Sequence, residues 1–413
     1  MHTFLARQPI FDRQKKVFAY ELLYRGAADA SDSMSPLEIT SHVLSNATLL
    51  FGMRNLTGGK PAFVNLDREA ILTDQIRSLP ADVVVAEVLE TVEPEPEILE
   101  KLAGLRADGY TIAIDDFIGQ ENYDPLIDAA DIVKIDFHGT EADQRQKMAD
   151  DFLGRDKHIL AEKVEEESEF KRALQDGFHY FQGYFFARPE TIKRKRMSEV
   201  GTQHLQLIMD LQRRELDYKS LEEIISRDPA LTFKLMQFIN SAYFGWISPI
   251  TSIRHALVQM GTQEIRTWAT FVTMGTMGND KPDELNVIAL TRARMCELLS
   301  TALKRGNESK EYFLMGMFSL LDAMMDMPLD EIIDSIPLGR ALKSALAGEP
   351  SRQRSVLELV TRYERADFDG VWKNAMDLGL APETIFQAYI DATAWAQGSF
   401  DLQHRAKSEG VRK

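Results

Sequence analysis

The stretch TIAIDDF (residues 111–117) carries a largely apolar run directly into two adjacent carboxylates, Asp115 and Asp116. An apolar run of this length between polar turn residues is typical of a strand that is buried on both faces. Two like charges at the end of such a strand raise the free energy of the fold unless a cation or protonation relieves them. The sequence therefore predicts a neutralising partner at this position.

Seven further strand-like runs accompany this one within the first 190 residues. They are TFLARQPIF (3–11), VFAYELLYR (17–25), AFVNLD (62–67), VVVAEVLE (83–90), DIVKIDF (131–137), HILAEKVE (158–165) and FHYFQGYFF (178–186). Helical segments such as PEILEKLAGLRADG (96–109) separate the later runs, and this alternation favours a closed, TIM-like (β/α) barrel over an open sheet. Only DRQKK (12–16) joins the first two runs, so we expect a modified barrel in which one strand is antiparallel.

The sequence pattern changes after Pro189, and helical patterns dominate from about residue 201 onward. Segments such as SLEEIISRDPALTFKLMQFINSAY (220–243) show the spacing of amphipathic helices, and strand signals almost disappear. We therefore predict two domains: an α/β barrel over residues 1–195 and an all-helical domain over residues 196–413.

Composition limits the classes of partner. The formal net charge is −16, and residues 1–200 hold 24 Lys and Arg against 36 Asp and Glu. This charge disfavours nucleic acid as a partner, and a phosphate ester would need metal ions to bind in the first half. No apolar run is long enough for a membrane span. The single cysteine, Cys296, fits a reducing compartment and a buried structural thiol, so we expect a cytoplasmic protein.

Polar residues recur at the ends of the predicted barrel strands. They are Glu21, Asn65, Glu87, Asp115 with Asp116, Lys134 with Asp136, Glu162, and Gln182. Their spacing is about one strand–helix unit, so all of them can project to the same end of a barrel, where barrel enzymes place their sites. Any single acid is more often a helix cap or a surface ion pair, but the periodic set requires a common explanation. Oxygen ligands without a His or Cys cluster favour Mg²⁺ or Mn²⁺, as one or two ions, over zinc.

The same motifs resemble the EAL domain, a bacterial phosphodiesterase of cyclic di-GMP. The resemblance covers about residues 1–195 and rests on RQPIF, ELLYR, FVNL, EVLE, DDF, KID, AEKVE and FQGYFFARP in order. Residues 200–400 resemble an HDOD domain through SRDPALTFKLMQFINSAYFG and PITSIRHALVQMG. The histidines there, His204, His255 and His404, are not followed by Asp, so we expect a non-catalytic module. The resemblance implies that this module contacts a protein partner.

The resemblance implies a role for each polar residue of the barrel. It assigns Glu21, Asn65, Glu87 and Asp115 to one metal ion and Asp116 to a second, with Glu162 close by. Lys134 and Asp136 would orient the attacking water, which hydrolyses cyclic di-GMP to linear pGpG. Gln8 and Arg25 would contact the nucleotide beside Gln182, Glu90 would hold the loop after Phe117, and that loop would connect metal binding to contacts in a homodimer.

Three departures from the family pattern keep an alternative open. Leu22 replaces an alanine, Lys163 replaces a glycine, and the loop IGQENYDP (118–125) replaces a glycine-rich sequence. Ile118 within that loop lacks the backbone freedom of glycine. The retained acids favour a weak phosphodiesterase, whereas the altered loop favours a degenerate barrel that acts as a cyclic di-GMP receptor or a protein scaffold.

Overall fold

The computed structural model describes residues 3–26, 56–188, 218–226, 235–236, 238–239, 250, 252–277, 281–335 and 338–410. The chain divides into two compact units. The first holds Met1–Arg188 together with Glu358–Ile390, and the second holds Pro189–Leu357 together with Asp391–Lys413. The predicted boundary at residue 195 falls outside the described residues and stays a prediction.

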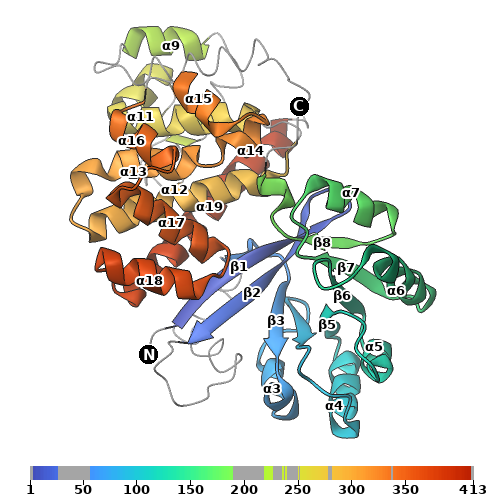
Figure 1. The fold of residues 1–413 in the computed structure, drawn as a ribbon. Coiled ribbons are helices and arrows are strands. Elements are labelled where there is room, and N and C mark those ends of the chain that lie inside the picture. The colour runs from blue at the N-terminus through green and yellow to red at the C-terminus, as the bar shows by residue number, and fades with distance from the viewer. Residues whose placement is uncertain are drawn as a thin grey trace. The chain divides into compact units, whose positions relative to one another are not determined.

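The first unit contains the predicted eight-stranded barrel (Figure 1). Its strands are β1 (Thr3–Asp12), β2 (Val17–Gly26), β3 (Ala62–Leu66), β4 (Val84–Val88), β5 (Thr111–Phe117), β6 (Ile132–Asp136), β7 (His158–Glu162) and β8 (Tyr180–Gln182). β1 is antiparallel to both β2 and β8, and every other neighbouring pair is parallel. The modified barrel with one antiparallel strand is therefore confirmed.

The β1–β2 turn has a local cause in the sequence. The Asp12 carboxylate accepts hydrogen bonds of 2.9 Å from the backbone N–H groups of Gln14 and Lys16, and Lys15 takes a left-handed φ of 57°. An Asp side chain that bonds to the backbone two residues on is a common turn device. The two strands are thus joined without a helix, which forces them to run antiparallel.

Short helices connect the other strands on the outside of the barrel (Figure 1). They are α3 (Arg68–Leu72), η1 (Gln75–Ser78), α4 (Pro96–Ala107), α5 (Asp124–Ala129), α6 (Ala142–Gly154) and α7 (Glu167–Gln175), and η2 (Phe185–Ala187) follows the last strand. Pro96 starts α4, where its missing N–H costs nothing, and a capping box between Glu166 and Glu169 starts α7.

An apolar layer fills the interior of the barrel. It consists of Ile10, Ala19, Phe63, Val85, Ala113, Ile132 and Leu160, with Tyr180 packed against it. Because residues two apart on a strand face the same side, the next inward layer is fixed by this one. That layer is Gln8, Glu21, Asn65, Glu87, Asp115, Lys134, Glu162 and Gln182. The polar set therefore lies directly above the apolar layer, at the carboxyl ends of the parallel strands.

A β-bulge explains how two adjacent aspartates serve one site. The register between β5 and β6 passes from Ile114–Val133 to Phe117–Ile135, which is three steps on β5 against two on β6. Asp116 takes a left-handed φ of 43° at this point. Neighbouring residues of a regular strand face opposite sides, whereas a bulge re-aims a side chain. Asp115 therefore stays in the inward layer, whereas Asp116 leaves the regular alternation and still places an oxygen within 4.8 Å of oxygens of Asp115 and Glu162.

Helices from the far end of the chain complete the barrel unit. The Tyr363 hydroxyl accepts a hydrogen bond of 3.3 Å from the Leu5 N–H of β1, and the Tyr389 hydroxyl accepts one of 3.1 Å from the Arg7 N–H. Phe4 stacks on Phe368 with ring centroids 5.7 Å apart. β1 pairs with β8 only through Ile10–Asp12, so these contacts satisfy N–H groups beyond that short ladder.

We predict that Tyr363→Phe lowers the free energy of unfolding of the full chain by about 1–3 kcal/mol, because the buried Leu5 N–H loses its hydroxyl partner. Urea unfolding followed by circular dichroism measures this change. The matched control is Met376→Leu on an exposed position, which should stay within about 0.5 kcal/mol of the wild type. Equal stability of the Tyr363 variant and the control would contradict the proposed cover of β1.

The remaining described elements are helical, as predicted. They are α9 (Tyr218–Ser226), α11 (Ile253–Met277), α12 (Asp283–Ala302), η3 (Gly306–Glu308), α13 (Ser309–Phe318), α14 (Leu321–Met325), α15 (Leu329–Ser335), α16 (Arg340–Leu346), α17 (Arg352–Glu364), α18 (Phe368–Leu378) and α19 (Pro382–Gly410). Gly261, with a φ of 75°, interrupts α11. Cys296 is buried in α12, as expected of a structural thiol.

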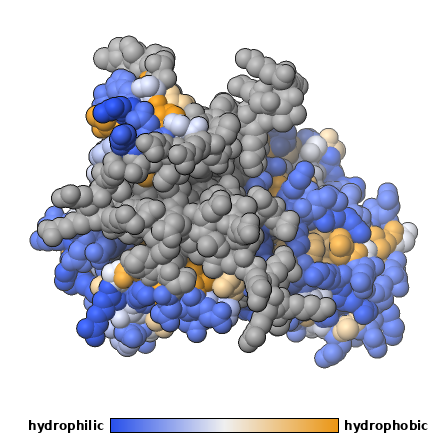
Figure 2. Space-filling model, turned by 90° about the horizontal axis from the view of Figure 1, so that it is seen from above, coloured by the Kyte–Doolittle hydropathy of each residue, from blue (hydrophilic) through white to orange (hydrophobic). Residues whose placement is uncertain are grey.

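The described surface is mainly hydrophilic where the view of Figure 2 is coloured, and hydrophobic residues form small groups on it. Within the described ranges, every helix is too short or too polar to cross a bilayer.

Candidate active site

A fully buried ammonium group lies at the centre of the polar layer. The Lys134 Nζ donates to Asp115 Oδ1 at 2.7 Å and lies 3.0 Å from Glu162 Oε1 and 3.4 Å from Glu21 Oε2. It also donates to Glu87 Oε1. Four carboxylates therefore share one ammonium, and three negative charges remain without compensation when all of the carboxylates are ionised. The expected pairing of Lys134 with carboxylates is confirmed.

Two amide side chains extend this network. The Gln182 Nε2 donates to Glu21 Oε2 at 2.6 Å and to Gln8 Oε1 at 3.1 Å. The Asn65 Nδ2 lies 3.5 Å from Glu21 Oε1. Gln8 and Glu21 are register partners on β1 and β2, and Gln182 of β8 is paired with Ile10, two residues from Gln8 on β1. The antiparallel strand thus brings a predicted nucleotide-binding residue next to the acidic layer.

Burial changes the protonation of this layer. Desolvation raises the pKa of Glu87 and of Glu162 well above the usual range. The neighbouring carboxylates raise these two pKa values further, whereas the positive charge of Lys134 lowers them. Burial alone would lower the pKa of Lys134, but the attraction of the carboxylates outweighs it and holds that pKa well above its ordinary value. Lys134 therefore stays charged, while Glu87 and Glu162 favour a proton or another cation.

Several oxygen atoms of the layer have room for such a cation. Four buried oxygens of this layer have no hydrogen-bond partner within the described part of the chain: Asn65 Oδ1, Glu87 Oε2, Glu162 Oε2 and Gln182 Oε1. Unsatisfied buried acceptors are rare and need an explanation. In addition, oxygen atoms of Asp115, Asp116 and Glu162 lie within 4.8 Å of one another. Oxygen donors of this type suit a hard divalent cation, so the residues present fit Mg²⁺ or Mn²⁺.

A second, smaller cluster lies on the bulge side of the site. The Lys163 Nζ donates to Asp116 Oδ1 at 2.7 Å, to Asp116 Oδ2 at 3.0 Å and to Asp136 Oδ2 at 2.7 Å. The other oxygen of Asp136 accepts from the backbone N–H groups of His138 and Gly139. Burial alone would raise the pKa of Asp136, but these donors lower it below its usual range. Asp116 and Asp136 are thus linked through Lys163.

The loop after Phe117 is held by tyrosine and glutamine contacts. The Tyr123 hydroxyl donates to the backbone carbonyls of Glu90 at 2.5 Å and of Val92 at 3.0 Å. Gln144 Nε2 donates to the Ile118 carbonyl at 2.9 Å. The left-handed conformations of the loop fall on Gly119, with a φ of 98°, and on Asn122, with a φ of 66°, and not on Ile118. The contact of Glu90 with this loop therefore uses its backbone, and its predicted loop-stabilising role remains a prediction.

The structure brings together nearly all of the residues singled out in the sequence. Gln8, Glu21, Asn65, Glu87, Asp115, Lys134, Glu162 and Gln182 form one layer, and Asp116 and Asp136 lie beside it. The side chain of Arg25 lies outside the described residues. Lys163 stands out in the sequence only as a departure from the family pattern. Its contacts could not be predicted, because nothing in a linear sequence shows that its Nζ reaches two aspartates.

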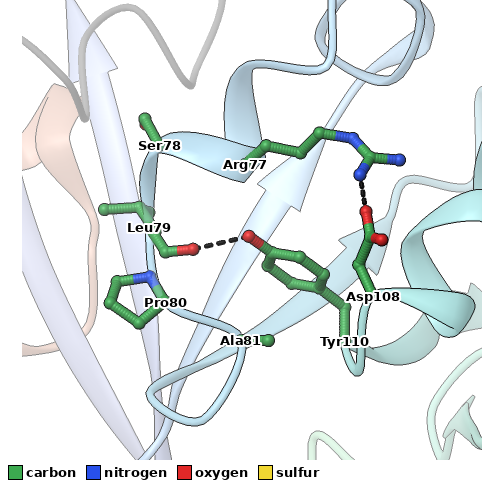
Figure 3. Close-up of a pocket in the computed structure, with 7 residues that line it drawn as sticks. All are labelled: Arg77, Ser78, Leu79, Pro80, Ala81, Asp108 and Tyr110. Atoms are coloured by element: carbon green, nitrogen blue, oxygen red, sulfur yellow. Dashed lines mark hydrogen bonds and ion pairs between the residues drawn. The ribbon is translucent and has the colours of Figure 1, made fainter.

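A pocket elsewhere on the barrel is unrelated to this layer. It is lined by Arg77, Ser78, Leu79, Pro80, Ala81, Asp108 and Tyr110. Figure 3 shows the Tyr110 hydroxyl bonded to the Leu79 carbonyl, at 2.6 Å, and Arg77 paired with Asp108. These residues precede β4 and β5, so the pocket lies at the amino ends of the strands, opposite the carboxylates.

We predict that the metal-free protein loses stability as the pH rises above about 4.5, the usual Glu value. Glu87 and Glu162 have raised pKa values in the folded state, so folding binds protons in this range and the stabilisation is lost as they ionise. Added Mn²⁺ should offset the loss, and its effect should grow with pH because the ligands must be deprotonated. Thermal unfolding in EDTA and in Mn²⁺ at several pH values tests this. A metal effect that shrinks as the pH rises would contradict it.

The sequence matches models of two families. The EAL domain covers residues 2–189, and the HDOD domain covers residues 199–324. Cyclic di-GMP phosphodiesterase CdgJ of Vibrio cholerae is 32% identical over 399 residues, which cover 96% of this chain and 92% of that protein. Uncharacterized protein YuxH of Bacillus subtilis is 32% identical over 414 residues, which cover 98% of this chain and 100% of that protein.

The chain also resembles solved structures. A crystal structure of the Bacillus subtilis YkuI protein, with an EAL domain and in complex with cyclic di-GMP and calcium, is 20% identical and has a TM-score of 0.36. The match covers 62% of this chain and 71% of that one.

Proposed function

This chain belongs to the family of proteins that join an EAL domain to an HDOD domain, and we propose that its barrel hydrolyses cyclic di-GMP to linear pGpG. The observation that carries the proposal is the buried layer of carboxylate and amide oxygens at the carboxyl ends of the barrel strands, several of which have no partner among the described residues. A scaffold gains nothing from so many clustered acids, whose burial raises its free energy. A phosphodiesterase would use such acids to bind a divalent cation.

Oxygen atoms of Glu21, Asn65, Glu87 and Asp115 would hold one cation, with Glu162 close by. Asp116 is the residue that the resemblance to the EAL domain assigns to a second cation. When bound, Mg²⁺ or Mn²⁺ supplies positive charge that neutralises the substrate phosphate and acidifies a water molecule. Lys134 keeps the carboxylates at fixed positions, since its ammonium contacts four of them. We propose that either Mg²⁺ or Mn²⁺ can fill this role.

The other polar residues would position substrate and water. Gln8 and Gln182, with Arg25 from β2, would contact the nucleotide at the side of the layer formed by the antiparallel strand. Glu162 has a raised pKa and a buried oxygen with no partner among the residues that the structure describes, which suits a group that accepts and returns a proton during attack on phosphorus. Asp136, predicted to orient the water, has both of its oxygens engaged and would act through Lys163.

The helical domain would regulate the barrel through a protein partner and carry no chemistry of its own. We propose that the protein acts in the cytoplasm, as a homodimer or in a complex with that partner. We also propose that it binds neither nucleic acid nor membranes. We propose residues 1–195 and 196–413 as the two sequence domains, with Glu358–Ile390 packed back on the barrel unit.

The alternative is a receptor that binds cyclic di-GMP without cleaving it. The exposed Ile118 side chain supports this alternative, because it lies beside Gly139 and Asp136. A glycine in place of Ile118 would leave this space open. Incubation of the purified full chain with cyclic di-GMP and Mn²⁺, followed by chromatography, separates the two readings. Linear pGpG that forms in Mn²⁺ and not in EDTA supports the enzyme, whereas tight binding with unchanged nucleotide would establish the receptor.

A further inference from the structure

The two halves of the acidic site differ in how their oxygens are satisfied. In the inward layer, buried oxygens of Asn65, Glu87 and Glu162 have no partner within the described residues. On the bulge side, both oxygens of Asp116 and one of Asp136 already accept from the ammonium of Lys163. One half therefore has ligands to offer to a cation, and the other half already has a cation.

The backbone of Lys163 supports a specific role for this side chain. Lys163 has a φ of 56°, in the left-handed region that disfavours residues with a Cβ atom. A glycine would adopt this conformation without strain, so the chain keeps a lysine at a position where the backbone prefers glycine. The Nζ reaches Asp116 and Asp136 at 2.7 Å each, which are the lengths of charge-assisted hydrogen bonds. The contacts with both carboxylates also hold the pKa of Lys163 above its ordinary value, although burial opposes this.

A divalent cation shared by Asp115, Asp116 and Glu162 would compete directly with this ammonium. The three carboxylates are close enough to share an ion. Such an ion would need an Asp116 oxygen, yet both oxygens of Asp116 are bonded to Lys163. Two cations placed a few ångströms apart also repel each other.

We propose that the ammonium of Lys163 takes the place of a second divalent cation, so that each barrel binds one metal ion in its inward layer. This inference rests on the proposed metal site and not on hydrolysis itself. Lys163 would act as a positioning residue that keeps Asp116 and Asp136 neutralised and in place.

The test is the number of Mn²⁺ ions bound per chain, measured by equilibrium dialysis on the full chain without nucleotide. Electron paramagnetic resonance of the same samples would reveal coupling between two neighbouring ions. We expect one uncoupled Mn²⁺ in the wild type and two coupled ions in Lys163→Gly, which removes the ammonium and suits the backbone. Lys163→Met, which keeps most of the side chain, should also bind two, and Lys163→Arg, which keeps the charge, should bind one.

The matched control is Lys147→Ala on the exposed face of α6, which should bind one ion like the wild type. Two ions in the wild type would overturn the inference and leave the proposed function standing. A single ion in both Lys163→Gly and Lys163→Met would also overturn it. Binding of no ion by the wild type would overturn the metal site and the inference together.

Discussion

Replacement of Asp115 by Asn should lower the rate of cyclic di-GMP hydrolysis by at least about 100-fold, the scale of losses seen when groups that order a metal are removed. Asp115 stands in the inward layer, where Oδ1 contacts Lys134 at 2.7 Å. Asn has almost the same shape, so the bulge after Ile114 should persist while the charge and one ligand oxygen are lost. Initial rates in saturating Mn²⁺ measure the effect, and circular dichroism checks the fold.

A matched control separates this effect from a general loss of acidic charge. Asp124→Asn makes the same chemical change on α5, where the side chain is exposed and pairs with Arg155. Its hydrolysis rate should equal that of the wild type within a factor of about two, as expected for a surface ion pair of small energetic weight. If Asp115→Asn keeps a rate close to that of the control, the inward layer does not carry the reaction.

Replacement of Lys134 by Met should destabilise the metal-free protein by about 3–5 kcal/mol, the usual result of removing one partner from a buried ion cluster. The Lys134 side chain is fully buried, and its removal leaves Glu21, Glu87, Asp115 and Glu162 facing one another. Mn²⁺ should recover part of the loss, because a cation can neutralise the same oxygens. Urea unfolding in EDTA and in Mn²⁺ gives both quantities.

Lys147→Met is the control for this second variant, since Lys147 is exposed on α6 and should change stability by less than about 0.5 kcal/mol. Our description of the layer is contradicted if Lys134→Met unfolds at the same urea concentration as this control in EDTA. It is also contradicted if the free energy of unfolding of Lys134→Met is the same in Mn²⁺ as in EDTA.

The barrel and its polar layer could be predicted because both follow from short-range periodicity. Strand-like runs of six to nine residues mark the strands, and the interval between strand ends fixes which residues share one end of the barrel. The inward layer then needs only the two-residue period of a strand, which places Glu87 above Val85 and Lys134 above Ile132.

Features that depend on distant or irregular backbone could not be predicted. The bulge that separates the directions of Asp115 and Asp116 comes from pairing with β6, which a local pattern does not reveal. The bonds of Lys163 to Asp116 and Asp136 span 47 and 27 residues of sequence. The return of Glu358–Ile390 to the barrel unit depends on contacts such as that between Leu5 and Tyr363, which lie 358 residues apart.

The most direct test of hydrolysis in the barrel is a single turnover in ¹⁸O-labelled water, with the full chain in excess over cyclic di-GMP and with Mn²⁺ present. Attack of water on phosphorus with departure of the ribose 3′ oxygen should place one labelled oxygen on the new 5′ phosphate of pGpG, as read by mass spectrometry. Asp115→Asn, run in parallel, should yield almost no labelled product. Recovery of intact, unlabelled cyclic di-GMP from the wild-type reaction would contradict the proposed phosphodiesterase.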